Sequence, residues 1–81
     1  MRESIQIVVP KVGILSEDAY LDQWLKHPGE RVTLGEEVCS MDFDKARVMV
    51  ESPAAGILTA TLANEGDLVP VGAAIALLTP D

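Results

Sequence analysis

Short runs of alternating apolar and polar residues extend along most of the chain. The clearest is Ile5–Val9, where Ile5, Ile7 and Val9 fall on one face of an extended strand. The runs are separated by clusters of Gly, Pro, Asn, Asp and Ser, which are typical of turns. Further strand runs follow the first: 19–26, 31–34, 38–41, 48–50, 57–62, 68–71 and 73–78. The pattern therefore predicts an all-β fold of about eight short strands and no helix.

The second half of the chain repeats the first at a spacing of 37 residues. Aliphatic residues of the strand runs and glycines of the turns both recur at this spacing: Leu21 and Leu58, Leu25 and Leu62, Gly29 and Gly66, Val32 and Val69, Leu34 and Val71, Gly35 and Gly72, and Val38 and Ile75. The first strand matches 48–50 at a spacing of 43, so the six extra residues fall in the loop between Lys11 and Glu17. Such a repeat predicts two similar halves, packed face to face about a pseudo-twofold axis as two antiparallel sheets.

A polar segment with one lysine lies between the runs 38–41 and 48–50. This segment is predicted to be the tip of a β-hairpin, because the carboxylates of Asp42 and Asp44 can accept hydrogen bonds from turn N–H groups. Lys45 is then expected at the hairpin tip, exposed to water. The twofold axis places this tip at one end of the molecule and both chain termini at the other. An exposed lysine is by itself ordinary, since lysine is rarely buried.

The composition restricts the partners that the chain can bind. At 81 residues it fits one domain, 1–81, with its strands within 4–79. Its net charge of −7 disfavours nucleic acid and anionic membrane surfaces, and would attract a basic patch on a partner protein. Cys39 is the single cysteine and lies in an apolar run, so a buried side chain is expected in preference to a reactive thiol. No run has transmembrane length, and the N-terminus shows no signal-peptide pattern.

The sequence shows no constellation of catalytic or metal-binding residues. His27 stands alone in a Pro-Gly turn, where a solvated side chain is expected. Free lysine has a pKa of about 10.4 and is a poor nucleophile at pH 7 without a base beside it. We therefore expect no catalytic residue, no metal site, and a chain that is not an enzyme by itself.

Five short motifs occur in an order and spacing that together resemble the biotinyl/lipoyl attachment domain family, over essentially the whole chain. They are Val9-Pro10-Lys11-Val12-Gly13, the segment from Trp24 to Val32, Asp42-Phe43-Asp44-Lys45-Ala46, Ser52-Pro53-Ala54-Ala55-Gly56 and Glu65-Gly66-Asp67. The chain looks most like the lipoyl domains of dihydrolipoamide acyltransferase (E2) subunits of 2-oxo acid dehydrogenase complexes. The resemblance implies a barrel-sandwich hybrid, which is a flattened barrel or sandwich of two roughly four-stranded antiparallel sheets.

The family's lipoyl domains carry lipoate on the lysine of a Glu-Thr/Ser-Asp-Lys-Ala motif, which Lys45 matches. The resemblance thus implies covalent lipoate on Lys45, with Asp44, Ala46 and Asp42 recognised by the modifying ligase. Biotinyl members resemble Met-Lys-Met at this place. The neighbours Asp44 and Ala46 therefore favour lipoate over biotin.

Two residues depart from the family pattern. Glu30 replaces the usual Asp, and Phe43 replaces a small hydroxyl residue beside the lysine. Phe43 has the same strand parity as Cys39 and Met41. It is therefore expected either to point inward at the end of the sheet or, if exposed, to add an apolar contact for a partner.

The resemblance also implies a set of partner proteins. A lipoate-protein ligase or lipoyl transferase attaches the lipoate. The lipoyl-lysine then acts as a swinging arm that carries acyl groups and reducing equivalents between a thiamine-diphosphate-dependent E1, the E2 acyltransferase core and the flavin-dependent dihydrolipoamide dehydrogenase E3. Two alternatives remain, a biotin carboxyl carrier domain and an unmodified interaction module of the same fold. The expected compartment is the cytoplasm, or the mitochondrial matrix if the parent protein is eukaryotic.

The extra loop, residues 12–18, is a candidate for partner recognition, because loops on a rigid scaffold commonly carry it. The two-half arrangement places this loop at the same end of the molecule as Lys45. We expect Ile14, Leu15, Ser16 and Glu17, together with Phe43, to help E1 to recognise the domain. The alternative is that Ile14 and Leu15 only cover the open edge of the core.

Overall fold

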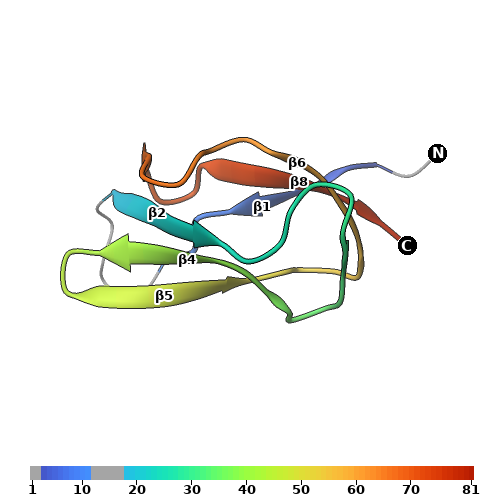
Figure 1. Ribbon diagram of the computed structural model, residues 1–81, viewed down its shortest axis with the longest axis horizontal. Coiled ribbons are helices and arrows are strands. Elements are labelled where there is room, and N and C mark those ends of the chain that lie inside the picture. The colour runs from blue at the N-terminus through green and yellow to red at the C-terminus, as the bar shows by residue number, and fades with distance from the viewer. Residues whose placement is uncertain (1–2, 12–17) are drawn as a thin grey trace.

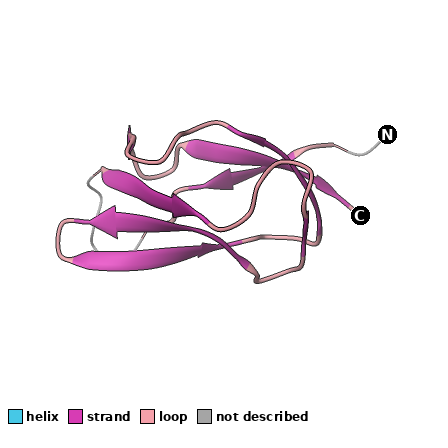
Figure 2. Ribbon diagram, viewed as in Figure 1, coloured by secondary structure: helices cyan, strands magenta, loops and turns pink. Residues whose placement is uncertain are grey.

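A computed structural model of the chain describes residues 3–11 and 18–81. These residues form eight strands and no helix (Figures 1 and 2). The strands are β1 (Ile5–Val8), β2 (Ala19–Trp24), β3 (Arg31–Val32), β4 (Glu37–Phe43), β5 (Ala46–Glu51), β6 (Gly56–Thr61), β7 (Leu68–Val69) and β8 (Ala74–Pro80). They pair into two four-stranded sheets, in the orders β1-β8-β6-β3 and β5-β4-β2-β7, and every pairing is antiparallel. The predicted fold class is confirmed.

The two sheets are copies of one another, as the repeat predicts. Strands β2, β3 and β4 begin and end 37 residues before β6, β7 and β8. The matched glycines share a positive φ that only glycine adopts cheaply: Gly29 at 95° with Gly66 at 93°, and Gly35 at 82° with Gly72 at 88°. Across the halves, Gly29 N donates to Leu58 O and Gly66 N donates to Leu21 O, both at 2.7 Å. The pseudo-twofold axis thus relates backbone hydrogen bonds as well as strands.

The core lies between the two sheets and consists mainly of aliphatic side chains. Its largest fully buried members are Ile7, Leu21, Met41, Leu58, Ile75, Leu78, Val9, Val32, Val38 and Cys39. Burial raises the pKa of the Cys39 thiol to about 12, so the thiol stays protonated at physiological pH. Cys39 is therefore a small buried hydrophobe, as expected from its apolar surroundings in the sequence.

Trp24 joins the two halves at the end of β2. Its ring is buried, and its indole N–H donates a 3.0 Å hydrogen bond to the carbonyl of Ala63. Its backbone N–H donates to the carboxylate of Glu65 at 2.9 Å. Both partners belong to the turn that follows β6, so this side chain ties β2 to the second half of the chain.

Several strands are shorter than the sequence pattern predicts. The second strand ends at Trp24 and not at Lys26, because both Leu25 N and Lys26 N turn to donate to the carbonyl of Val38. The third strand ends at Val32, and Leu34 is exposed. Register shifts in β2 and β4 also interrupt strict alternation, so that four consecutive residues of β4, from Val38 to Met41, are buried.

The molecule is elongated, with a longest extent of 38 Å. The turn between β4 and β5 lies at one end, on the left in Figure 1, whereas β1 begins and β8 ends toward the other. This arrangement is the one that the twofold axis predicts for the lysine hairpin and the chain termini. Symmetry explains this arrangement. The pair Ile5 and Leu78 in one sheet is equivalent to the pair Val48 and Met41 in the other sheet. The β1–β8 pair, which contains the termini, is therefore the symmetry mate of the β4–β5 hairpin.

Candidate functional site

The tip of the β4–β5 hairpin is a tight turn with Lys45 in it. The two strands pair in continuous register from Cys39 opposite Val50 to Phe43 opposite Ala46, which leaves Asp44 and Lys45 as the turn residues. Neither turn residue has a positive φ, and both side chains are exposed. A long, regularly paired hairpin therefore presents Lys45 at a defined position at the end of the molecule.

Phe43 anchors this turn in the core. Its side chain is 5% exposed and lies on the same side of β4 as Cys39 and Met41. Of the two possibilities drawn from its strand parity, the structure shows the inward one. The residue that departs from the family pattern therefore packs beneath the turn, where it adds apolar contact to the end of the core.

Asp42 and Asp44 border a hollow beside the lysine turn. The hollow has a volume of about 360 Å³ and is lined by Asp18, Tyr20, Asp42, Phe43 and Asp44. Asp18 is the last residue of the loop predicted to take part in recognition, whereas Tyr20 was not among the predicted site residues. Strand pairing explains their position, because Tyr20 of β2 lies directly opposite Asp42 of β4.

The carboxylate of Asp42 is bound by a guanidinium and not by the turn backbone. Arg47 Nε donates to Asp42 Oδ1 at 2.7 Å, and Arg47 Nη2 donates to Asp42 Oδ2 at 3.4 Å. The Asp42 hydrogen bond raises the pKa of Arg47, which therefore stays charged. The expected role of Asp42 as a hydrogen-bond acceptor for turn N–H groups is thus replaced by a cross-strand ion pair.

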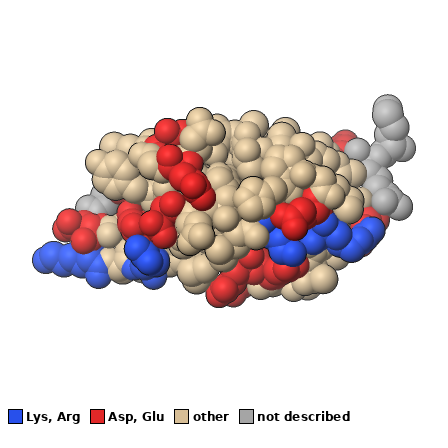
Figure 3. All heavy atoms as spheres, viewed as in Figure 1, with Lys and Arg blue, Asp and Glu red and all other residues tan. Residues whose placement is uncertain are grey.

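Lys45 has no carboxylate within ion-pair distance among the described residues. Figure 3 shows basic side chains projecting at the hairpin end of the molecule, next to a group of acidic ones. Of the four predicted residues, Asp44 and Lys45 form the turn and Asp42 and Ala46 lie on the strands beside it. The amine of Lys45 has no ion-pair partner in the part of the chain that the structure describes.

The candidate recognition residues Ile14, Leu15, Ser16 and Glu17 lie outside the described residues. The residue that follows them, Asp18, lines the hollow beside Asp44. This end of the predicted recognition loop is therefore close to the lysine turn. The role of the loop itself stays a prediction.

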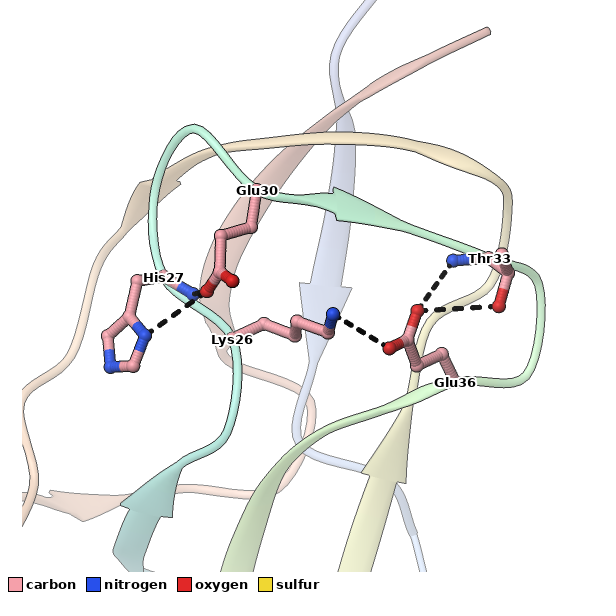
Figure 4. A network of polar contacts seen from close by, with 5 residues as sticks. All are labelled: Lys26, His27, Glu30, Thr33 and Glu36. Atoms are coloured by element: carbon pink, nitrogen blue, oxygen red, sulfur yellow. Dashed lines mark hydrogen bonds and ion pairs between the residues drawn. The ribbon is translucent and has the colours of Figure 1, made fainter.

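A second polar network occupies the turns on either side of β3 (Figure 4). Glu30 Oε1 accepts a 2.7 Å hydrogen bond from the backbone N–H of His27, which lowers the pKa of Glu30. In the other half of the chain Asp67 Oδ2 accepts in the same way from Asn64 N at 2.8 Å. The longer Glu30 side chain thus makes the hydrogen bond that Asp makes at the equivalent turn.

The remaining groups of this network pair with one another. Lys26 Nζ lies 2.9 Å from Glu36 Oε2, and this hydrogen bond raises the pKa of Lys26 and lowers that of Glu36. His27 is exposed, with Nδ1 3.2 Å from Glu30 Oε1.

Within residues 3–11 and 18–81, no group of three or more His, Cys, Asp or Glu side chains is placed to hold a metal ion. No helix of that same region is long and apolar enough to span a membrane.

Comparison with known proteins places the chain among biotin and lipoyl attachment domains. Residues 5–78 match the family described as "Biotin-requiring enzyme". The chain is 40% identical over 73 residues to the dihydrolipoyllysine-residue succinyltransferase component of the 2-oxoglutarate dehydrogenase complex of Staphylococcus saprophyticus, which covers 90% of this chain and 17% of the relative. It is 36% identical over 76 residues to the acetyltransferase component of the acetoin cleaving system of Cupriavidus necator, covering 94% of this chain and 20% of the relative. The chain thus spans a fifth or less of these relatives.

A solved structure agrees with the sequence relatives. The solution structure of the lipoyl domain of the 2-oxoglutarate dehydrogenase complex from Azotobacter vinelandii is similar with a TM-score of 0.75 and 32% identity. The match covers 93% of this chain and 95% of that domain. The chain therefore belongs to the biotin/lipoyl attachment domain family and is a homologue of the lipoyl domains of E2 acyltransferases.

Proposed function

We propose that the chain is a lipoyl carrier domain with Lys45 as its attachment site. The observation that supports this most is the exposed Lys45 in a two-residue turn, on a hairpin at the opposite end of the molecule from the start of β1 and the end of β8. A primary amine in this position can form an amide with the carboxyl group of lipoate. Asp44 and Ala46 flank it as in the lipoyl members of the family.

The chain's own residues present the amine but do not activate it. His27 lies in the turn after β2, and β2 runs away from the lysine end, since Tyr20 pairs with Asp42 and Trp24 with Cys39. The thiol of Cys39 is buried and protonated. Neither group can act as a base for Lys45, so attachment depends on a lipoate-protein ligase or lipoyl transferase that supplies an activated acyl group and a base.

Once bound, lipoate supplies a dithiolane that accepts an acyl group and two electrons. The domain contributes a rigid end for that arm. We propose an E1, an E2 core and an E3 of a 2-oxo acid dehydrogenase complex as the partners, because curated relatives are acyltransferase components of such complexes and of an acetoin cleaving system. A tethered carrier raises the effective concentration of the bound intermediate at each active site.

The test is intact-mass analysis of the protein produced separately with a lipoate-protein ligase and with a biotin-protein ligase, each with its cofactor. A lipoyl increment on the wild-type chain that is lost in Lys45→Arg supports the proposal. Lys26→Arg is the matched control, because Lys26 is bound to Glu36 at the far end. A biotinyl increment would favour the biotin carrier, and no increment with either ligase would favour the unmodified interaction module. A lipoyl increment that persists in Lys45→Arg would refute the assignment of the site.

A further inference from the structure

Arg47 is the basic side chain of the lysine hairpin that the family motif does not include. It lies on β5, directly opposite Asp42 of β4. Besides its two hydrogen bonds to Asp42, its Nη2 lies 3.7 Å from Asp22 Oδ2 on β2. Asp22 Oδ2 in turn accepts a 2.9 Å hydrogen bond from the hydroxyl of Ser40. One guanidinium thus connects three adjacent strands just below the turn that carries Lys45.

Two cations lie in or next to the turn, and of these Arg47 binds the carboxylate of Asp42. Lys45 is three residues from Asp42 along the chain, and Arg47 is five residues away. Arg47 has the better position, because residues directly opposite in an antiparallel pair have adjacent side chains. It also has the better geometry, since a guanidinium engages both carboxylate oxygens whereas an ammonium acts as a point charge. Asp42 is therefore committed to Arg47, and the Lys45 amine is left without a partner among the described carboxylates.

We propose that Arg47 is a positioning residue for the acylation of Lys45, because it holds the Asp42 carboxylate away from the lysine amine. This inference rests on the proposed function. In the acylation step the lone pair of the amine attacks the carboxyl carbon of an activated acyl donor. The amide C–N bond forms, the bond to the leaving group breaks, and the proton of the amine passes to a base of the ligase or solvent. An amine held in an ion pair with Asp42 would be protonated more of the time and would be turned back toward the strand.

The side chain of Arg47 is 61% exposed, so its ion pairs contribute little to folding. The effect should therefore appear in the reactivity of Lys45 and not in stability. The chain offers a matched control in Arg31, which is 62% exposed and donates from Nη1 to both carboxylate oxygens of Asp81, at 2.8 and 2.7 Å. Arg31→Gln and Arg47→Gln make the same change of charge and break the same kind of pair, but Arg31 belongs to β3 and not to the lysine hairpin.

The experiment measures chemical acylation of the unmodified protein by the N-hydroxysuccinimide ester of acetic acid, below saturation. Peptide mass spectrometry gives the rate at Lys45 relative to the exposed Lys11 as an internal reference. In Arg47→Gln the relative rate at Lys45 should fall by a factor of about two to five, which is the range that an exposed ion pair can supply. Arg31→Gln should leave it unchanged. The double variant Asp42→Asn/Arg47→Gln should restore it, because the competing carboxylate is gone.

An unchanged relative rate at Lys45 in Arg47→Gln would overturn the proposal. A rate that falls but is not restored in the double variant would also overturn it, because Arg47 would then act through the shape of the hairpin and not through Asp42. No ligase takes part in this assay, so its outcome is separate from that of the proposed function. If ligases leave wild-type Lys45 unmodified, the carrier function fails whatever the reagent shows.

Discussion

Replacing Phe43 by Ala tests whether this unusual residue anchors the lysine turn or contacts a partner. Phe43 as a residue is 5% exposed and belongs to the core cluster between the two sheets. Truncating a buried Phe to Ala costs about 3–5 kcal/mol. Phe43 lies at the end of the sheet and borders the hollow beside Asp44, so water can enter and the cost should fall near the lower limit. We expect a loss of about 3 kcal/mol in the free energy of unfolding.

Urea unfolding, followed by tryptophan fluorescence of Trp24, measures this loss. With a denaturant slope of about 1 kcal/mol/M, expected for a chain of this size, the midpoint should fall by about 3 M. The thermal midpoint should fall by roughly 12–24 °C. Phe43→Leu is the matched control, since it keeps most of the apolar volume and should cost less than about 1.5 kcal/mol.

The same pair of variants separates packing from recognition. Because the ring faces inward, folded Phe43→Leu should be lipoylated at Lys45, and its lipoyl group reductively acylated by E1, at the rates of the wild-type chain. A loss below about 1 kcal/mol in Phe43→Ala would mean that Phe43 is not part of the core. A folded Phe43→Leu that is acylated several-fold more slowly would mean that the ring contacts a partner, and the inward role would be refuted.

Three further perturbations test a close backbone approach, the residues that flank Lys45, and the buried thiol. In Gly56→Ala the new Cβ would meet the backbone carbonyl oxygen of Thr79, which cannot move without breaking the β6–β8 pairing. Calorimetry should therefore show a loss of about 3 kcal/mol in the free energy of unfolding. A loss near zero would contradict the close approach of the two backbones. Changing both Asp44 and Ala46 to Met should lower lipoylation several-fold, measured by intact mass. The free energy of unfolding, measured with urea, should change by no more than about 0.5 kcal/mol. An unfolded variant would mean that these residues are structural. Burial raises the pKa of Cys39 from 9.0 to about 12, so the unfolded chain loses the thiol proton at a lower pH than the folded chain. The free energy of unfolding should therefore fall as the pH rises from 9 toward 12. Cys39→Ala should make this fall with pH less steep, and an unchanged pH dependence would argue against the burial effect.

The order of hydrophobic and turn residues was sufficient to predict the architecture. Alternation of side chains along a strand follows from backbone geometry, and glycine is the residue that adopts a positive φ at low cost. Matched aliphatics and glycines at a spacing of 37 therefore predicted matched strands and turns, and the bounds of β2, β3 and β4 repeat in β6, β7 and β8. The place of Lys45 at a hairpin tip, far from both termini, followed from the same symmetry.

The electrostatic state of the lysine turn was decided only in the tertiary structure. Asp42 was predicted to bind the turn backbone, but it binds Arg47, because cross-strand register sets those two side chains opposite one another. Asp22 also joins the pair although it is 25 residues from Arg47 in sequence, since β2 lies beside β4 and a register shift separates Leu21 from Gln23. Local sequence determines which faces of a strand are apolar, whereas ion pairs depend on which strands are neighbours and on their bulges. The ion pairs of the lysine turn therefore could not be predicted from the sequence, because they depend on the pairing and register of the strands in the folded sheets.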